Sequence, residues 1–132
     1  RVALGANPQQ VVKAISEAEA YDGPSIIIAY AHCINHGLNL AKGVEQQKKA
    51  VACGHWPLYR YNPVLEDEGK NPLTIDSKEP TIDFSEYALN ENRYRMLKLS
   101  NPDQFDQLME ASQKDVTKGW KFLQSRFKSL ED

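Results

Sequence analysis

The chain has 132 residues, a formal net charge of −2 and nearly balanced numbers of acidic and basic residues, 18 against 16. This length suits a single domain, and the lack of a basic stripe argues against a nucleic-acid-binding surface. No apolar run is long enough to cross a membrane, and two cysteines are too few for a secreted disulfide scaffold. We therefore expect reduced thiols and a cytoplasmic location.

The first thirty residues predict a strand, a helix and a second strand. Residues 2–6 have the composition of the end of a buried strand, and Asn7 is a suitable cap for a helix that starts at Pro8. The run 22–24 (Asp-Gly-Pro) ends this helix. Residues 25–30 (Ser-Ile-Ile-Ile-Ala-Tyr) are typical of a fully buried strand. A strand–helix–strand unit places its strands parallel, so we expect an α/β fold with a partial parallel sheet flanked by helices.

The middle of the chain is less regular. Residues 44–53 predict a short helix that ends at Gly54, and residues 58–61 alternate as a strand does. A proline-rich, irregular stretch follows over residues 62–83, with a short edge strand at 73–75.

Two helices are predicted at the C-terminal end. The first begins at Asp83, as a variant of a capping box, and runs to about Leu99. The second covers residues 102–130, where apolar side chains recur every three or four positions. We accordingly divide the chain into a main part, 1–100, and a C-terminal amphipathic helix, 101–132.

Residues 30–37 (Tyr-Ala-His-Cys-Ile-Asn-His-Gly) follow the second apolar strand, where α/β sheets place their ligands. The residues alone leave four roles open for Cys33. The first is that of a small apolar residue in the core. The second is a nucleophile with His36 as its base, the third a zinc ligand together with His36, Cys53 and His55, and the fourth an iron–sulfur ligand. A [4Fe–4S] cluster normally takes four thiolates, so this chain could donate only one ligand to it.

The neighbouring candidates have simpler explanations. Gly37 permits a tight turn with positive φ, and His36 is suited to a structural hydrogen bond, including one near a cluster. Cys53 is expected to pack in the core. Trp56 and residues 59–61 (Tyr-Arg-Tyr) favour the core over a stacking surface.

Several motifs together resemble the C-terminal part of pyruvate:ferredoxin (flavodoxin) oxidoreductases. The resemblance covers roughly the first 95 residues closely, and several motifs in the right order are far more specific than one. They are residues 5–10 (Gly-Ala-Asn-Pro-Gln-Gln), 18–21 (Ala-Glu-Ala-Tyr), 33–37 (Cys-Ile-Asn-His-Gly), 46–51 (Gln-Gln-Lys-Lys-Ala-Val), 56–63 (Trp-Pro-Leu-Tyr-Arg-Tyr-Asn-Pro) and 69–80.

The resemblance implies both a fold and an activity. The fold would be the end of a thiamine diphosphate-binding domain. The parent enzyme would oxidatively decarboxylate pyruvate to acetyl-CoA and CO2 and pass electrons through [4Fe–4S] clusters to ferredoxin or flavodoxin. Cys33 would be the distant fourth ligand of the cluster nearest thiamine diphosphate. The other thiolates, and the ligands of thiamine diphosphate and Mg²⁺, would precede Arg1.

On this interpretation the chain is a piece of a longer protein, catalytically inert by itself, whose parent acts as a homodimer on pyruvate and CoA without a nucleic acid or membrane partner. It begins with Arg1 and shows no signal-peptide pattern. Two alternatives remain. One is a stand-alone interaction module whose 102–130 helix docks a partner. The other is a cysteine-dependent enzyme that uses Cys33 and His36.

Overall fold

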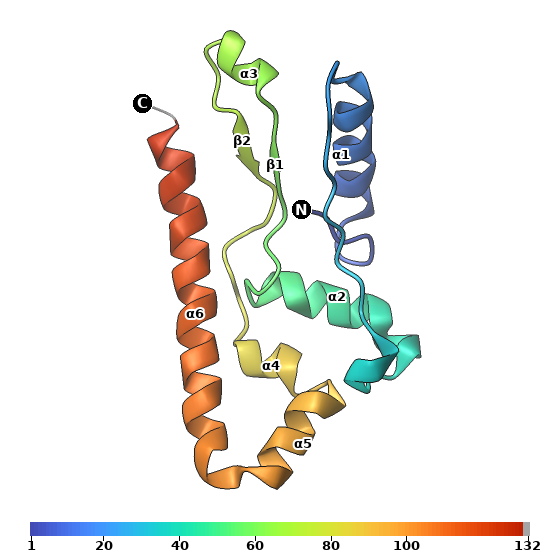
Figure 1. Ribbon diagram of the computed structural model, residues 1–132, viewed down its shortest axis with the longest axis vertical. Coiled ribbons are helices and arrows are strands. Elements are labelled where there is room, and N and C mark those ends of the chain that lie inside the picture. The colour runs from blue at the N-terminus through green and yellow to red at the C-terminus, as the bar shows by residue number, and fades with distance from the viewer. Residues whose placement is uncertain (131–132) are drawn as a thin grey trace.

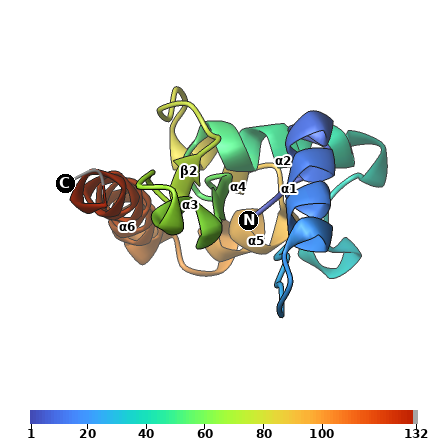
Figure 2. The same ribbon diagram turned by 90° about the horizontal axis from the view of Figure 1, so that it is seen from above.

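The structure is a computed structural model that describes residues 1–130. It is mostly helical, with α6 along one side, α1 along the other and a small β-hairpin between them (Figures 1 and 2). The elements in chain order are α1 (Pro8–Ala20), the 3₁₀ turns η1 (Ile34–His36) and η2 (Leu40–Lys42), α2 (Gly43–Ala52), β1 (Tyr59–Tyr61), α3 (Val64–Asp67), β2 (Leu73–Ile75), α4 (Phe84–Ala88), α5 (Asn92–Ser100) and α6 (Pro102–Ser129).

Helix α1 begins where the sequence predicts. The side-chain Oδ1 of Asn7 accepts a hydrogen bond of 3.0 Å from the backbone N–H of Gln10, and Pro8 opens the helix. The cap gives a hydrogen-bond partner to one of the backbone N–H groups that have none at the start of a helix. Proline has no backbone N–H, so at the first helical position it leaves no donor without a partner. Only Gln10 and Ala14 of this helix are buried, so α1 contacts the rest of the chain along one narrow face.

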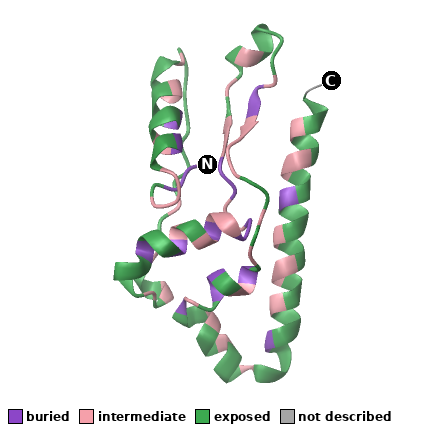
Figure 3. Ribbon diagram, turned by 180° about the vertical axis from the view of Figure 1, so that it is seen from behind, coloured by how far each residue is buried: buried purple, intermediate pink, exposed green. Residues whose placement is uncertain are grey.

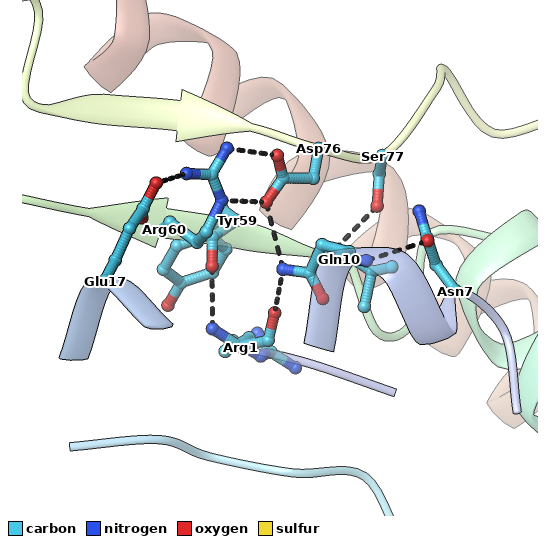
Figure 4. A network of polar contacts seen from close by, with 9 residues as sticks. Arg1, Asn7, Gln10, Glu17, Tyr59, Arg60, Asp76 and Ser77 are labelled. Atoms are coloured by element: carbon cyan, nitrogen blue, oxygen red, sulfur yellow. Dashed lines mark hydrogen bonds and ion pairs between the residues drawn. The ribbon is translucent and has the colours of Figure 1, made fainter. Parts of the chain in front are cut away.

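A polar network fastens α1 to the hairpin (Figure 4). The guanidinium of Arg60 donates to both carboxylate oxygens of Asp76, at 2.8 and 2.9 Å, and to Glu17 of α1. Nε2 of Gln10 donates to the same Asp76 carboxylate at 2.9 Å and to the carbonyl of Arg1 at 3.2 Å. Burial alone raises the pKa of Asp76, but the hydrogen bonds from Arg60 and Gln10 outweigh burial and lower it.

Strands β1 and β2 form a two-stranded antiparallel sheet, with Arg60 opposite Thr74. This confirms the strands predicted within residues 58–61 and at 73–75. The helix predicted over residues 44–53 is confirmed as α2, shifted by one residue. Pro72, directly before β2, accepts from the N–H of Asn62 at 2.9 Å but cannot donate a bond in return, so the regular pairing ends at Leu73.

The parallel sheet expected from the first two predicted strands is reduced to a single parallel bridge between Val2 and Ala29. The prediction that residues 25–30 are fully buried is wrong. Residues 25–29 are exposed, with 87% of Ile26 accessible, and Figure 3 shows this segment largely as exposed surface beside α1. A parallel strand is buried when neighbouring strands and helices cover both faces, and the described residues provide only α1 and the short piece at Val2.

The single helix predicted from Asp83 to Leu99 is also wrong, because the structure has α4 and α5 with a turn between them. Asp83 precedes α4, but its side chain makes no capping bond. Instead, the side-chain oxygen of Gln113 in α6 accepts from the backbone N–H of Phe84 at 2.7 Å. The break falls at residues 89–91 (Leu-Asn-Glu), where Asn90 weakens helix propensity.

The core lies where α2, α4 and α6 meet. Cys53, Phe84 and Tyr87 are fully or nearly fully buried in it, and Met109 and Val116 of α6 pack against it. The helix predicted over residues 102–130 is confirmed as α6, which ends one residue earlier, at Ser129. Residues 131–132 of the predicted C-terminal part lie outside the described residues. None of the helices in residues 1–130 combines the length and apolarity that a membrane crossing needs.

Candidate functional site

Cys33 stands at the start of the tight turn η1. The backbone N–H of His36 donates to the Cys33 carbonyl at 3.0 Å, and that of Gly37 donates to the Ile34 carbonyl at 3.0 Å. Gly37 then leaves the turn with a φ of +70°. The predicted positive φ at Gly37 is confirmed, and it is a conformation that glycine adopts without a steric penalty.

The turn is pressed against the start of α5. The carbonyl of Gly37 accepts a hydrogen bond of 3.2 Å from the backbone N–H of Asn92. A Cβ atom at position 37 would lie 2.2 Å from Cβ of Asn92, closer than real Cβ contacts come. Glycine is therefore required here both for its backbone conformation and for the space that it leaves.

His36 is tied to a buried carboxylate. Its Nδ1 lies 3.7 Å from Oε2 of Glu91, which is 0% exposed. Glu91 also accepts from Nε of Arg93 at 2.6 Å and, through its other oxygen, from Nε2 of Gln46 in α2 at 3.1 Å. Through these contacts the Glu91 carboxylate connects the turn, α2 and α5. A buried carboxylate is tolerated when donors such as these bind its oxygens.

The residue before Cys33 is held as well. The ring of His32 lies against Gly43 at the start of α2, where an added Cβ would be 2.3 Å from Cε1 of that ring. Cys33 thus lies between two histidines that contact other elements: the His32 ring lies against the start of α2, and His36 faces Glu91 in the turn between α4 and α5. The backbone that carries its thiol therefore has neighbours on both sides.

The Cys33 thiol is free and half-buried. The ring of His36 faces Glu91 and, at 3.5 Å through Nε2, Arg93. No hydrogen bond joins the Cys33 thiol to that ring within residues 1–130. A thiol nucleophile needs a base within hydrogen-bond reach, so the arrangement does not favour the cysteine-enzyme alternative.

The proposed zinc set is not assembled. Cys53 is buried in the core, its Sγ donates to the Ala50 carbonyl at 3.5 Å, and burial raises the pKa of its thiol. His55 stacks on Tyr87 with ring centroids 5.0 Å apart, and burial lowers the pKa of its imidazole. In the described part of the chain, no group of three or more His, Cys, Asp or Glu side chains could hold a metal ion. The packing role expected for Cys53 fits this placement.

The aromatic residues after α2 divide between core and surface. Trp56 packs edge-on against Tyr30 at 5.5 Å, and its Nε1 donates to the Val2 carbonyl at 3.0 Å. The guanidinium of Arg1 lies over the Trp56 ring, 3.7 Å from its centroid. Trp56 is thus a packing residue, as expected, whereas Tyr61 is exposed.

Sequence reasoning missed the residues that hold the turn, namely Glu91, Asn92 and Gly43. Asn90, which weakens helix propensity just before Glu91 and Asn92, was a usable signal for the first two. Nothing local marks Gly43, because its role is to leave room for His32, eleven positions earlier in the sequence.

The arrangement offers one soft metal ligand, the sulfur of Cys33, at a tight turn. A thiolate suits zinc, copper(I) or iron–sulfur clusters, but these need further ligands. The residues present fit an iron–sulfur cluster only if Cys33 supplies one of its ligands and other chain segments supply the rest.

Comparison with known proteins gives consistent matches along nearly the whole chain. It is 51% identical over 123 residues to a pyruvate-flavodoxin oxidoreductase of a Nostoc species, covering 93% of this chain. It is 52% identical over 115 residues to the pyruvate:ferredoxin oxidoreductase of Moorella thermoacetica, covering 87%, and 46% identical over 123 residues to a probable pyruvate-flavodoxin oxidoreductase of Escherichia coli. The chain spans only about 10% of the length of each relative. No protein-family model matches it.

Proposed function

We propose that this chain is part of an oxidoreductase that oxidatively decarboxylates pyruvate, and that Cys33 is one ligand of a [4Fe–4S] cluster in it. The observation that carries the proposal is the match of about 90% of the chain, at 42–52% identity, to enzymes named pyruvate-flavodoxin or pyruvate:ferredoxin oxidoreductase. The overall reaction converts pyruvate and CoA to acetyl-CoA and CO2 and delivers the electrons to oxidised ferredoxin or flavodoxin.

The held turn supports Cys33 as a cluster ligand. A ligand must keep its position when a cluster changes charge, and the residues on both sides of Cys33 contact other elements, His32 at Gly43 and His36 at Glu91. Its thiol is half-buried, free of a disulfide and not engaged by the neighbouring imidazole. The cluster, when bound, carries single electrons. The contribution of this chain is to hold one thiolate and to keep the surrounding backbone amides in place.

The exposed apolar surface supports the proposal that the chain belongs within a longer protein. Ile26, Ile27 and Ile28 lie in succession at the surface, with a single backbone bridge nearby. Such a run is costly in water and is typical of a surface that another part of a protein covers. Thiamine diphosphate, Mg²⁺ and the remaining cluster ligands would come from that longer protein, as would the homodimer contacts. The free thiols fit a reducing cytoplasm.

The stand-alone interaction module is the weaker candidate. It requires the apolar stripe of α6 to lack a packing partner within the chain. Phe105 and Trp120 of this stripe are buried, and Met109 and Val116 pack on the core. The stripe is therefore used inside the chain, although Phe122 stays 64% exposed.

The test is Cys33→Ser in the full-length enzyme, with Cys53→Ala as the matched control. We expect Cys33→Ser to lower the iron content per chain, to alter the electron paramagnetic resonance signal of the reduced clusters and to abolish carrier reduction. Cys53→Ala should keep its iron, because Cys53 packs in the core away from the turn. A Cys33→Ser enzyme with full iron content and a normal rate of carrier reduction would refute the proposal.

A further inference from the structure

The imidazole of His36 has a charged neighbour at each of its two nitrogens. Oε2 of the Glu91 carboxylate lies 3.7 Å from Nδ1, and Nη1 of the Arg93 guanidinium lies 3.5 Å from Nε2. Both neighbours come from the start of α5, and Nε of Arg93 donates to the same carboxylate oxygen at 2.6 Å. The ring, the carboxylate and the guanidinium thus form a closed group of three.

The charges of these neighbours decide which nitrogen of His36 carries the proton. A guanidinium can only donate hydrogen bonds, so Nε2 is the acceptor toward Arg93. The proton then lies on Nδ1, where it faces the Glu91 carboxylate. Arg93 therefore fixes both the orientation and the tautomer of the ring.

The two charges differ in their exposure. The Glu91 side chain is 0% exposed and also accepts from Nε2 of Gln46, whereas 40% of the Arg93 side chain is accessible. Removing Arg93 would leave the carboxylate in place beside His36 without its cationic partner. Because a buried charge is screened less than an exposed one, the field of that carboxylate would then act on the turn.

His36 belongs to the same tight turn as Cys33. Its backbone N–H donates to the Cys33 carbonyl at 3.0 Å, and a turn of this kind keeps the two Cα atoms within about 7 Å of each other. The charges at the ring therefore contribute to the electrostatic potential around the candidate ligand. An iron–sulfur cluster gains one negative charge on reduction, so the charges around it help to set its reduction potential.

We propose that Arg93 is a positioning residue for the cluster ligand Cys33. It orients His36 within the turn, and its charge offsets that of Glu91, which raises the reduction potential of the cluster above the value that the carboxylate alone would impose. The two members of the pair act in opposite directions: Arg93 favours the reduced cluster and Glu91 the oxidised one. The inference rests on the proposed function, because it concerns the cluster that Cys33 binds there.

A purely structural role of the pair predicts a different pattern. Loss of either residue would then loosen the turn, and both variants would change the cluster in the same way. An electrostatic role predicts opposite shifts, because Arg93→Gln leaves a net negative charge at the pair and Glu91→Gln leaves a net positive one. The sign of the shift separates the two roles.

The experiment is a redox titration of the full-length enzyme, followed by electron paramagnetic resonance at the cluster whose signal Cys33→Ser alters. At the midpoint potential of the unmodified enzyme, we expect the ratio of reduced to oxidised cluster to fall about three- to tenfold in Arg93→Gln and to rise by a similar factor in Glu91→Gln, the order of magnitude for one unit charge near a partly exposed site. The double variant should return close to the unmodified ratio. Arg93→Lys keeps the charge and should shift the ratio less than Arg93→Gln does. The iron content per chain should stay unchanged in all four.

Arg126→Gln is the matched control. It removes the same charge from the last turn of α6, at the end of the molecule opposite to α5 (Figure 1). We expect this variant to leave the ratio of reduced to oxidised cluster unchanged.

The outcomes separate the possibilities. Shifts in the same direction for Arg93→Gln and Glu91→Gln, no shift in either, or an equal shift in Arg126→Gln would overturn the proposal. If Arg93→Gln does not assemble its clusters, Glu91→Gln still decides, because a ratio that does not rise there contradicts the proposal. A Cys33→Ser enzyme with every cluster signal intact would defeat the proposed function and this inference together. A signal that Cys33→Ser alters, but that the variants of the pair do not shift, would defeat this inference alone.

Discussion

The carboxylate of Glu91 lies 3.7 Å from Nδ1 of His36, three residues after Cys33, although the two residues are 55 positions apart in sequence. The same carboxylate contacts Arg93 and Gln46 and is 0% exposed. A single buried side chain therefore links the turn of the candidate ligand to two helices, and replacing it should loosen all three.

Glu91→Gln is expected to lower the free energy of unfolding by roughly 1–3 kcal/mol, because an amide nitrogen would face the donors of Gln46 and Arg93. Urea denaturation of the 132-residue chain measures this. Glu45→Gln is the control, since Glu45 is exposed and forms an ion pair with Lys49 at the surface, and it should change stability by no more than about 0.5 kcal/mol. Equal effects of the two variants would contradict the role given to Glu91.

Gly37→Ala and Gly69→Ala separate backbone strain from crowding. Both glycines have positive φ, +70° and +67°, so each substitution should cost about 1–2 kcal/mol for the backbone alone. Only at Gly37 would the new methyl group meet a neighbour, Asn92, and we expect at least about 1 kcal/mol of further destabilisation there. Thermal and urea unfolding of the two variants would show the difference, and similar losses would argue against a turn pressed onto α5.

Gly43→Ala tests the contact between α2 and the residue before Cys33. Its methyl group would lie 2.3 Å from the His32 ring, so we expect a loss of about 1–3 kcal/mol despite the better helix propensity of alanine. In a His32→Ala background the loss should largely disappear, which a double-mutant cycle measures as coupling. Gly119→Ala, in α6 with open space around it, should instead stabilise by about 0.5–1 kcal/mol.

The two cysteines should differ sharply in reactivity. Cys33 is half-buried, whereas Cys53 is 0% exposed and burial raises the pKa of its thiol. Iodoacetamide at neutral pH should therefore modify Cys33 in the native chain and Cys53 only after unfolding, because the thiolate is the reactive form. Mass spectrometry of tryptic peptides distinguishes the sites. Rapid native modification of Cys53 would show that the core between α2 and α4 is open.

Stability should fall as the pH drops below about 6.5, in part through His55. Burial lowers the pKa of its imidazole in the folded chain below 6.5, so the unfolded chain binds more protons in the interval between the two values. The free energy of unfolding therefore decreases as the pH falls through this interval. His55→Phe keeps a ring against Tyr87 but cannot titrate, and urea unfolding at pH 7 and pH 5 should show a weaker dependence in this variant than in the parent chain.

The helical parts of the fold were predictable because their signals are local. Asn7 and Pro8 mark the start of α1, and the spacing of Phe105, Met109, Val116 and Trp120 marks the buried face of α6. The split between α4 and α5 was missed although Asn90 marks it locally, and the hydrogen bond from Gln46 of α2 to Glu91 at this break lies between segments that the local pattern does not connect. The burial expected for residues 25–30 was wrong. An apolar run indicates a strand that is buried when other strands and helices pack on it, but it does not show whether these 132 residues contain those elements.

The candidate site was only partly predictable for the same reason. Cys33 and Gly37 stand out by residue type and position. The supports at Gly43, Glu91 and Asn92 depend on contacts between distant segments, and His36 was expected to make a structural bond without its partner being known. The cluster-ligand role of Cys33 remains a prediction that the iron content of the full-length variant will decide.

The open edge at Ile26–Ile28 also governs how the chain behaves in concentrated solution. Three consecutive exposed β-branched residues at the edge of a strand are a template with which like segments of other copies can pair, so the chain should tend to aggregate.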